Sequence, residues 1–168
     1  MPRIIENLPQ RLMDEAKRQV AELGYGATTI RSVARACGVG IGTVYNYYPS
    51  KDMLIGSSVL ADWKVCTARI CAVSEDAQDP KPVLRCMYEQ LRDFTRQYSG
   101  LFQDAAAVTG FVSAFGRYHG KLRSQLAVPL RKFCADDFQA EFIAEAVLTW
   151  TVDGKPAEQV EAMIRKLF

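Results

Sequence analysis

The stretch from Thr28 to Asp52 constrains the fold of this chain more than any other part of the sequence. Thr29 can cap a short helix whose apolar residues have the i, i+3, i+4 and i+7 spacing of a single face, namely Ile30, Val33, Ala34 and Cys37. Gly38 can then take the left-handed conformation that ends a helix, and Val39 can fill the corner before the next one. The pattern therefore predicts a helix-turn-helix.

The second helix of this motif, expected over residues 42–48, has a polar and aromatic surface. Val44 and Tyr48 are four residues apart and can hold the helix to a core. The side chains that are left to point outward are Thr43, Tyr45, Asn46 and Tyr47. Hydroxyls, an amide and aromatic rings can contact phosphates, base edges and thymine methyl groups in a major groove. The second helix is therefore interpreted as a DNA-recognition helix.

The motif resembles the TetR family of one-component transcriptional regulators. The resemblance is specific within residues 8–54 and extends loosely over the rest of the chain. It rests on the spacing of five features: Thr-Ile, Gly-Val, Gly-Thr-Val-Tyr, the aromatic Tyr48 and Ser-Lys-Asp. It implies an all-α homodimer with a three-helix head that contains the helix-turn-helix. It also implies an antiparallel helical body for effector binding and dimerisation, and a ligand-responsive repressor that binds a palindromic operator.

The resemblance further implies the residues that contact DNA: Thr29, Arg31, Gly42, Thr43, Tyr45, Asn46, Tyr47 and Lys51. Arg31 can bind a guanine edge with two hydrogen bonds, and Lys51 can hold a phosphate. Two positions depart from the family pattern, because Gly40 stands where a serine-like cap is usual and Ile41 where a polar residue is common. They leave open an alternative function, a helical protein-interaction module that has lost DNA binding.

Charge permits DNA binding without predicting it. The 168-residue chain has a net charge of +2, and all of this excess lies in residues 1–54, which have seven Lys and Arg against five acidic residues. So small an excess would not identify a nucleic-acid-binding protein by itself. The motif rather than the composition therefore leads to the prediction of double-stranded DNA as a partner.

Several other classes of protein find no support in the sequence. We expect a cytoplasmic chain with no membrane partner, because there is no secretory signal and no run of 18 apolar residues. We expect neither an enzyme nor a metal or cofactor site. The sequence has a single histidine and shows no nucleotide loop, catalytic triad or paired metal ligands. The five cysteines are expected to be reduced and mostly buried, while a redox switch at Cys66 and Cys71 is the alternative.

The chain is expected to have two domains. Apolar spacing from Ile4 to Leu23 predicts a first helix that ends at Gly24 or Gly26 and completes a DNA-binding domain over residues 1–49. Residues 50–168 would form the effector-binding and dimerisation domain. Its first helix would run from a Ser50 cap to about residue 73, before a linker over 74–82. Further helices are expected near 82–98 and 101–134, with breaks at Gly100, Gly110, Gly120 and Pro129.

The body contains most of the aromatic residues, from which we predict an effector pocket. Each one alone is more typical of a core, but together they favour an apolar pocket with a few polar groups. The predicted pocket residues are Trp63, Cys66, Ile70, Tyr88, Leu91, Phe94, Tyr98, Phe102, Phe111, Phe115 and His119. The expected effector is a small apolar or aromatic molecule.

The last two expected helices form a hairpin joined by residues 153–156. Their apolar residues recur every three or four positions: Phe138, Phe142, Ala146 and Trp150, then Val160, Met163, Ile164 and Leu167. The family resemblance implies that this hairpin is the dimer interface. The alternative is that it only closes the core of its own subunit.

Overall fold

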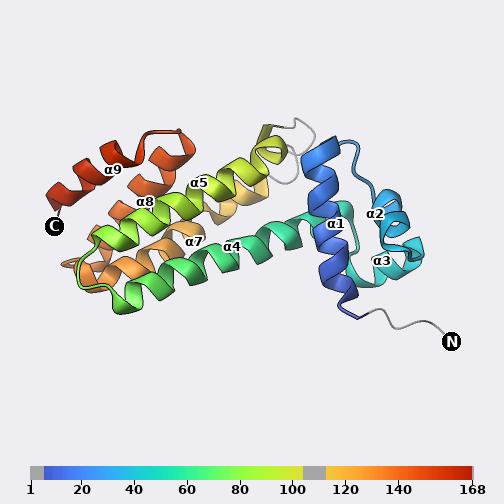
Figure 1. The fold of residues 1–168 in the computed structure, drawn as a ribbon, viewed down its shortest axis with the longest axis horizontal. Helices are drawn as coiled ribbons and strands as arrows, with labels where there is room; N and C mark the ends of the chain where they lie inside the picture. Colours follow the sequence, from blue (N-terminus) through green and yellow to red (C-terminus); the bar gives the residue numbers. More distant parts are fainter. Residues whose placement is uncertain (1–5, 104–112, 168) are drawn as a thin grey trace. The chain divides into compact units, whose positions relative to one another are not determined.

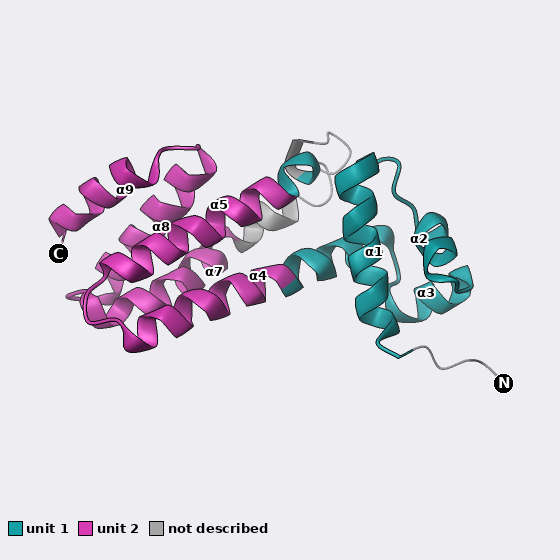
Figure 2. Ribbon diagram, in the orientation of Figure 1, with its two compact units in different colours: residues 1–61, 98–114 teal, residues 62–97, 115–168 magenta. Residues whose placement is uncertain are grey.

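The computed structural model describes residues 6–103 and 113–167, and every regular element in these two ranges is a helix (Figure 1). The predicted all-α fold is confirmed. The chain forms two compact units, residues 1–61 with 98–114 and residues 62–97 with 115–168 (Figure 2). All three boundaries, after residues 61, 97 and 114, fall inside helices. None of the described helices is long and apolar enough to span a membrane.

The first unit is built around helix α1, Leu8–Leu23. One face of α1 is buried, through Leu8, Leu12, Ala16 and Val20. Leu23, which the predicted stripe included, is 59% exposed, because the helix ends at Gly24 with a positive φ of 84°. Helices α2, Ile30–Cys37, and α3, Ile41–Tyr47, complete the three-helix head together with the start of α4. Ile4 lies outside the described residues.

Local signals fix the helix-turn-helix. The Thr29 hydroxyl accepts the Ser32 N–H at 3.0 Å, and the Ser32 hydroxyl accepts the Thr29 N–H at 3.1 Å, which is a capping box. At the other end of α2, Gly38 has a φ of 70° and the Val39 N–H donates to the Ala34 carbonyl at 3.0 Å. Helix α3 then begins at Ile41, one residue earlier than expected.

Long-range hydrogen bonds attach α1 to the elements that follow it. The Tyr48 hydroxyl, just after α3, donates to the Pro9 carbonyl at 3.2 Å. The Ser58 hydroxyl, on helix α4, Lys51–Asp76, donates to the Met13 carbonyl at 3.1 Å. The Ser50 hydroxyl caps α4 by accepting the Met53 N–H at 3.1 Å, as the sequence predicts. The first unit is thus held together around α1.

The second unit is an antiparallel helical bundle. It contains the later part of α4 and most of two further helices, α5, Lys81–Gln103, and α7, Ser113–Ala127. The elements that follow are η2, Val128–Phe133, α8, Asp137–Val152, α9, Ala157–Ile164, and η3, Arg165–Leu167. Trp63 of α4 packs edge-on against Phe94 of α5, with ring centroids 5.5 Å apart. The Trp63 indole N–H donates to the Gln125 side chain of α7 at 2.7 Å. Figure 1 shows these helices side by side.

Three expectations about helix ends are wrong. Helix α4 runs on to Asp76, so the predicted linker shrinks to residues 77–80, and the Lys132 ammonium stabilises this end by donating to the Ala77 carbonyl at 2.8 Å. Gly100 and Gly120 lie inside α5 and α7. A glycine costs a helix only about 1 kcal/mol, which a packed helix tolerates.

Two other predicted breaks had different outcomes. Pro129 does end regular α-helix, because α7 stops at Ala127 and η2 follows. Gly110 lies outside the described residues.

Candidate nucleic-acid interface

Helix α3 exposes its polar and aromatic side chains and buries its apolar anchors. Val44 is fully buried and Tyr48 is 9% exposed, whereas Tyr45 and Tyr47 are each about half exposed. Asn46 is exposed too, and the described residues offer the side chains of these three no hydrogen-bond partner. A short helix held by two anchors therefore presents hydroxyl, amide and ring groups that are free for an external contact.

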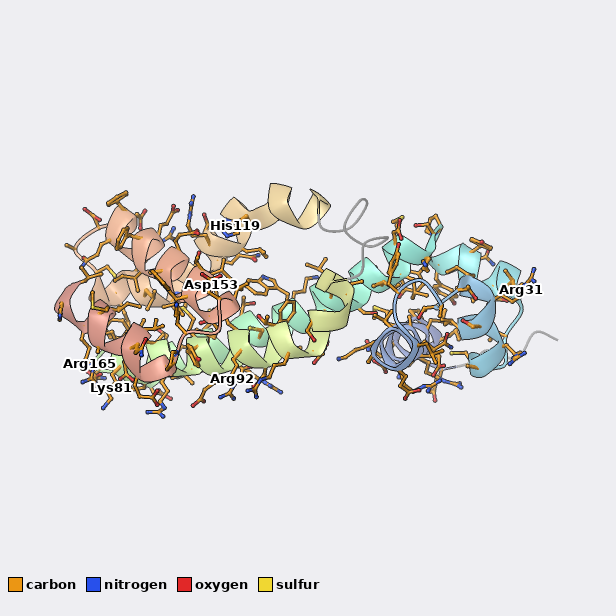
Figure 3. The ribbon with its side chains drawn as sticks, turned by 90° about the horizontal axis from the view of Figure 1, so that it is seen from above. Arg31, Lys81, Arg92, His119, Asp153 and Arg165 are labelled. Atoms are coloured by element: carbon orange, nitrogen blue, oxygen red, sulfur yellow. The ribbon has the colours of Figure 1, made fainter. Side chains whose placement is uncertain are left out.

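Helix α2 adds positive charge beside α3. Arg31 and Arg35 are one helical turn apart, and both are exposed (Figure 3 labels Arg31). Within the described part of the chain neither guanidinium has an ion-pair or hydrogen-bond partner, and residues 28–50 contain no acidic side chain. Arg35 was not among the predicted contacts, although its spacing of four from Arg31 is a signal that could have identified it.

The remaining predicted contact residues of the motif differ in how free they are. Thr29 is exposed, but its hydroxyl already accepts the Ser32 N–H. Thr43 is half-buried. Gly42 is exposed, and a Cβ added to it would meet nothing within 4 Å. The fold therefore does not need a glycine at position 42.

Lys51 is tied to the turn that follows α1. Its ammonium donates to the Tyr25 carbonyl at 2.9 Å and lies 3.8 Å from the centroid of the Tyr25 ring. The Tyr25 hydroxyl in turn donates to the Asp52 carboxylate. One of the three ammonium donors of Lys51 is thus in use, and the others are available to a phosphate.

Substituting Lys51 tests whether its ammonium also meets DNA. We expect Lys51→Ala to lower the affinity for all duplex sequences alike and to reduce the salt slope of binding by about one, because one phosphate contact is lost. Binding titrations over a range of salt concentrations would measure both. A loss confined to one sequence, or an unchanged salt slope, would contradict this role and leave Lys51 as a structural link to Tyr25.

The residues predicted to line an effector pocket are dispersed in the structure. Trp63, Cys66, Ile70, Leu91, Phe94 and Tyr98 are buried. His119 is partly exposed on α7, with its Nε2 3.6 Å from a carboxylate oxygen of Glu145. Phe111 lies outside the described residues, as do the side chains of Phe102 and Phe115. The buried members remain a prediction of where an effector enters.

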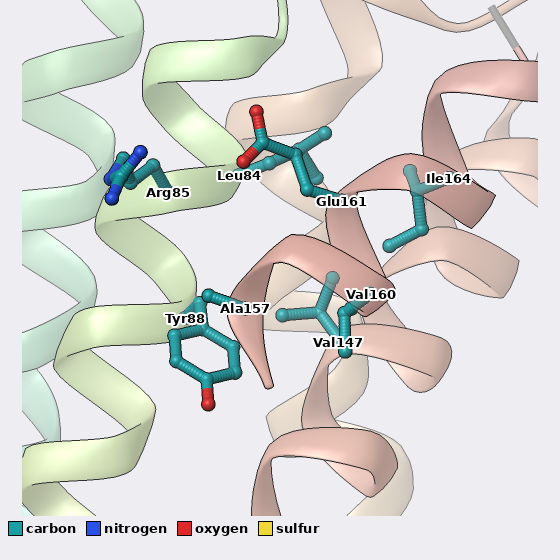
Figure 4. Close-up of a pocket in the computed structure, with 8 residues that line it drawn as sticks. All are labelled: Leu84, Arg85, Tyr88, Val147, Ala157, Val160, Glu161 and Ile164. Carbon is teal, nitrogen blue, oxygen red and sulfur yellow. The ribbon is translucent and has the colours of Figure 1, made fainter. Parts of the chain in front are cut away.

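Tyr88 lies apart from that buried group. It lines a small hollow where α5, α8 and α9 meet, and most of the other lining residues are apolar (Figure 4). Its hydroxyl donates to the Lys155 carbonyl at 2.7 Å, in the connection between α8 and α9. Tyr88 therefore fastens the C-terminal hairpin to α5.

The residues predicted for a dimer interface divide into two groups. Val160 and Ile164 are 8% and 3% exposed and line the hollow of Figure 4, so they belong to the core of their own subunit. Helix α9 turns this side toward α5 and α8 of the same chain, contrary to the prediction that both residues face a partner. The other group is accessible, with Ala146 half-buried and the rest exposed: Phe138, Phe142, Trp150, Met163 and Leu167.

The thiols of Cys66 and Cys71 are poorly suited to a redox switch. Cys66 is buried, and this burial raises its pKa to about 12. Burial also raises the pKa of Cys71, with a smaller contribution from Glu75. Because the thiolate is the reactive form, both residues are expected to be nearly inert near neutral pH.

Alkylation measures this inertness directly. We expect iodoacetamide to leave Cys66 unmodified in the folded chain near neutral pH and to modify it once denaturant unfolds the chain, as read by peptide mass spectrometry. Equal rates in the folded and unfolded chain would show an accessible thiolate and would restore the redox alternative.

Comparisons with known proteins agree with this geometry. The chain is 35% identical over 80 residues to the HTH-type transcriptional regulator BetI of Burkholderia thailandensis, a stretch that covers 46% of this chain and 40% of that protein. A TetR-family transcriptional regulator from Streptomyces coelicolor has a similar fold, with a TM-score of 0.61, 18% identity, and coverage of 95% of this chain and 94% of that one. The multidrug binding protein EbrR, solved with imidazole, gives a TM-score of 0.68, 19% identity, and coverage of 95% and 94%.

The capped turn between α2 and α3, with α3 exposed on a three-helix head, defines a helix-turn-helix protein of the transcriptional-regulator class. Residues 12–57 match the model of the family described as bacterial regulatory proteins, tetR family. Residues 12–57 are thus similar to the TetR family, and the chain shares the fold of a TetR-family regulator over 95% of its length. The match to the BetI relative spans 40% of that protein's length.

Proposed function

We propose that this chain is a homodimeric transcriptional repressor that binds a palindromic operator and responds to a small effector. The observation that carries the proposal is the surface formed by α2 and α3. It combines the guanidiniums of Arg31 and Arg35, which have no partner among the described residues, with the exposed side chains of Tyr45, Asn46 and Tyr47. Cations and hydroxyls suit phosphates, while an amide and a guanidinium suit base edges.

Gly42 adds an independent argument for a close external surface. Glycine inside a helix costs roughly 0.5–1 kcal/mol relative to alanine, yet a Cβ at this position would meet open space. The chain thus gives up stability that alanine would provide. A DNA backbone or a thymine methyl group that approaches α3 closely would explain this choice.

The Gly42→Ala variant separates folding from binding. We expect a free energy of unfolding that is unchanged or higher by up to about 1 kcal/mol, because alanine favours the helix. We also expect weaker binding to duplex DNA, because the methyl group occupies the space of the approaching ligand. Urea unfolding and DNA titration measure the two quantities. Undiminished affinity would show that DNA does not come close to Gly42.

A second copy of the chain is the proposed occupant of the exposed face of α8. The opposite face of α8 is already buried in its own subunit, through residues such as Ile143 and Val147. Phe138, Phe142 and Trp150 nevertheless lie outside, at 78%, 53% and 46% exposure. A helix that is apolar on two sides needs cover on both. Dimerisation places two recognition helices about 34–36 Å apart, in successive major grooves.

The effector is proposed to enter the body near the buried aromatic residues of α4 and α5. Trp63 and Phe94 supply ring surface there, and Gln125 supplies a polar group beside the indole. A small apolar or aromatic molecule fits this chemistry. EbrR, which shares the fold, has been solved with an aromatic molecule, imidazole. The proposed regulator works in the cytoplasm, where the effector would relieve DNA binding.

Selection of binding sites from a pool of random duplexes tests this function. The expected result is enrichment of a palindrome with half-sites about one helical turn apart. The alternative function, an interaction module without DNA binding, draws on the uncapped Gly40 and the apolar Ile41 at the start of α3. Absence of any enriched sequence and of binding at low salt would overturn the repressor and favour that alternative.

A further inference from the structure

Helix α3 contains no cationic side chain. Its seven residues, Ile41–Tyr47, carry hydroxyls, rings, one amide and aliphatic groups. We propose that α3 reads A·T base pairs, with Asn46 bound to an adenine and Ile41 against a thymine methyl group. This inference rests on the proposed function. At a rise of about 1.5 Å per residue, α3 is about 10 Å long and spans roughly three base pairs.

Asn46 occupies the centre of the exposed face. It is two residues after the buried anchor Val44 and so lies about 200° around the helix from it, and it precedes the second anchor, Tyr48, by two residues. Its amide, which has no partner among the described residues, can donate to adenine N7 and accept from adenine N6 at the same time. Guanine presents two acceptors at this edge, which match Arg or Lys instead.

Ile41 lies at the N-terminal end of α3, the end of a recognition helix that contacts base edges. It is 36% exposed although it is aliphatic. Its side chain can form no hydrogen bond with a phosphate or a base. The apolar group that a major groove offers is the thymine methyl. Gly42, next to Ile41 and without a Cβ, leaves room for that methyl group to come near.

The cation of the interface comes from α2 rather than α3. Arg31 is exposed and unpartnered within the described part of the chain, and it suits a guanine edge. Tyr45 and Tyr47 flank Asn46 and suit phosphates through their hydroxyls. Each half-site should therefore combine A·T pairs under α3 with separate pairs read by Arg31.

Variant selections assign each base preference to its residue. The full chain and its Asn46→Asp, Ile41→Ala and Arg31→Ala variants would each select sites from the same random duplex pool at one salt concentration. Leu23→Ala is the matched control for Ile41→Ala, because Leu23 is an aliphatic residue of the same unit, 59% exposed and outside α3. We expect Asn46→Asp and Ile41→Ala to weaken the base preference at adjacent A·T positions of the selected site. Arg31→Ala is expected to weaken the base preference at different positions.

Modified bases then test the contacts atom by atom. In the selected duplex, uracil in place of thymine removes the C5 methyl group, and 7-deazaadenine in place of adenine removes N7. We expect 7-deazaadenine to weaken binding by the full chain at least about fivefold and to have no effect on Asn46→Asp. Uracil is expected to weaken binding by the full chain and by Leu23→Ala, with no effect on Ile41→Ala.

The outcomes distinguish this inference from the proposed function. Two results would overturn A·T readout and leave the proposed repressor function intact. One is a specific palindrome with G·C pairs at the positions that depend on Asn46, and the other is full affinity after both base replacements. A chain that binds no duplex at low salt overturns both. The inference is supported if each base replacement lowers the affinity of the full chain and leaves the affinity of the corresponding variant, Asn46→Asp or Ile41→Ala, unchanged.

Discussion

Replacing Phe142 with aspartate is expected to convert the dimer to a monomer and to weaken operator binding by about a hundredfold or more. Phe142 is 53% exposed on α8, with its ring 6.4 Å from that of Phe138. In a dimer this position would be covered, and a carboxylate there would lose its water. A monomer binds one half-site alone and loses the gain of about 10²–10⁴ that linked sites provide.

The carboxylates already around Phe142 add to this effect. Glu141 and Glu145 line the open hollow that contains Phe138 and Phe142, together with Arg123. The Arg123 guanidinium lies 3.3 Å from Glu141 and 3.9 Å from Glu145, so it is already shared between two acids. A third carboxylate at position 142 would therefore lack a cation. Sedimentation of the free chain and titration of the operator measure the two results.

Val128→Asp is the matched control for Phe142→Asp. Val128 is 50% exposed in η2, outside α8 and outside the residues proposed for the interface, so it can receive the same charge as a control. We expect this variant to stay dimeric and to bind normally. A dimeric Phe142→Asp with full operator affinity would contradict the assignment of this face to a second copy.

Leu12→Ala is expected to reduce the free energy of unfolding of the head by about 2–5 kcal/mol. Leu12 is fully buried in the middle of α1, the helix to which the Tyr48 and Ser58 hydroxyls are bonded. Removing its branched side chain leaves a cavity at the centre of the first unit. Because α3 depends on this core, DNA binding should be lost at temperatures that the unchanged chain tolerates.

The same substitution at Leu23 provides the comparison. Leu23 is on the same helix but 59% exposed, so Leu23→Ala should change stability by no more than about 0.5 kcal/mol. Thermal and urea unfolding followed by circular dichroism would measure both variants. Similar losses in Leu12→Ala and Leu23→Ala would mean that α1 does not pack as described.

The head could be predicted closely because its signals are local. Thr29 and Gly38 mark the two ends of α2 by chemistry that acts within a few residues. The spacing of Val44 and Tyr48 likewise fixes which face of α3 is buried. The exposure of Leu23 and the attachment of Lys51 to Tyr25 needed the structure, and the second depends on a contact between residues 26 positions apart.

The body could be predicted less well because distant contacts decide it. Gly120 looks like a helix break in the sequence, but α7 continues through it. Val160 and Met163 belong to the same series of apolar residues that recurs every three or four positions. The packing of α9 nevertheless buries Val160 and leaves Met163 64% exposed. Periodicity finds an apolar face without saying whether its own subunit or a second copy covers it.

Footprinting on the selected duplex, with the number of bound chains counted in the same complex, tests the central claim most directly. The proposed dimer predicts two chains per duplex and two protected major-groove segments about 10–10.5 base pairs apart, related by the symmetry of the palindrome. A single protected segment, one chain per duplex, or protection that follows no sequence would contradict a dimeric repressor that reads DNA through α3.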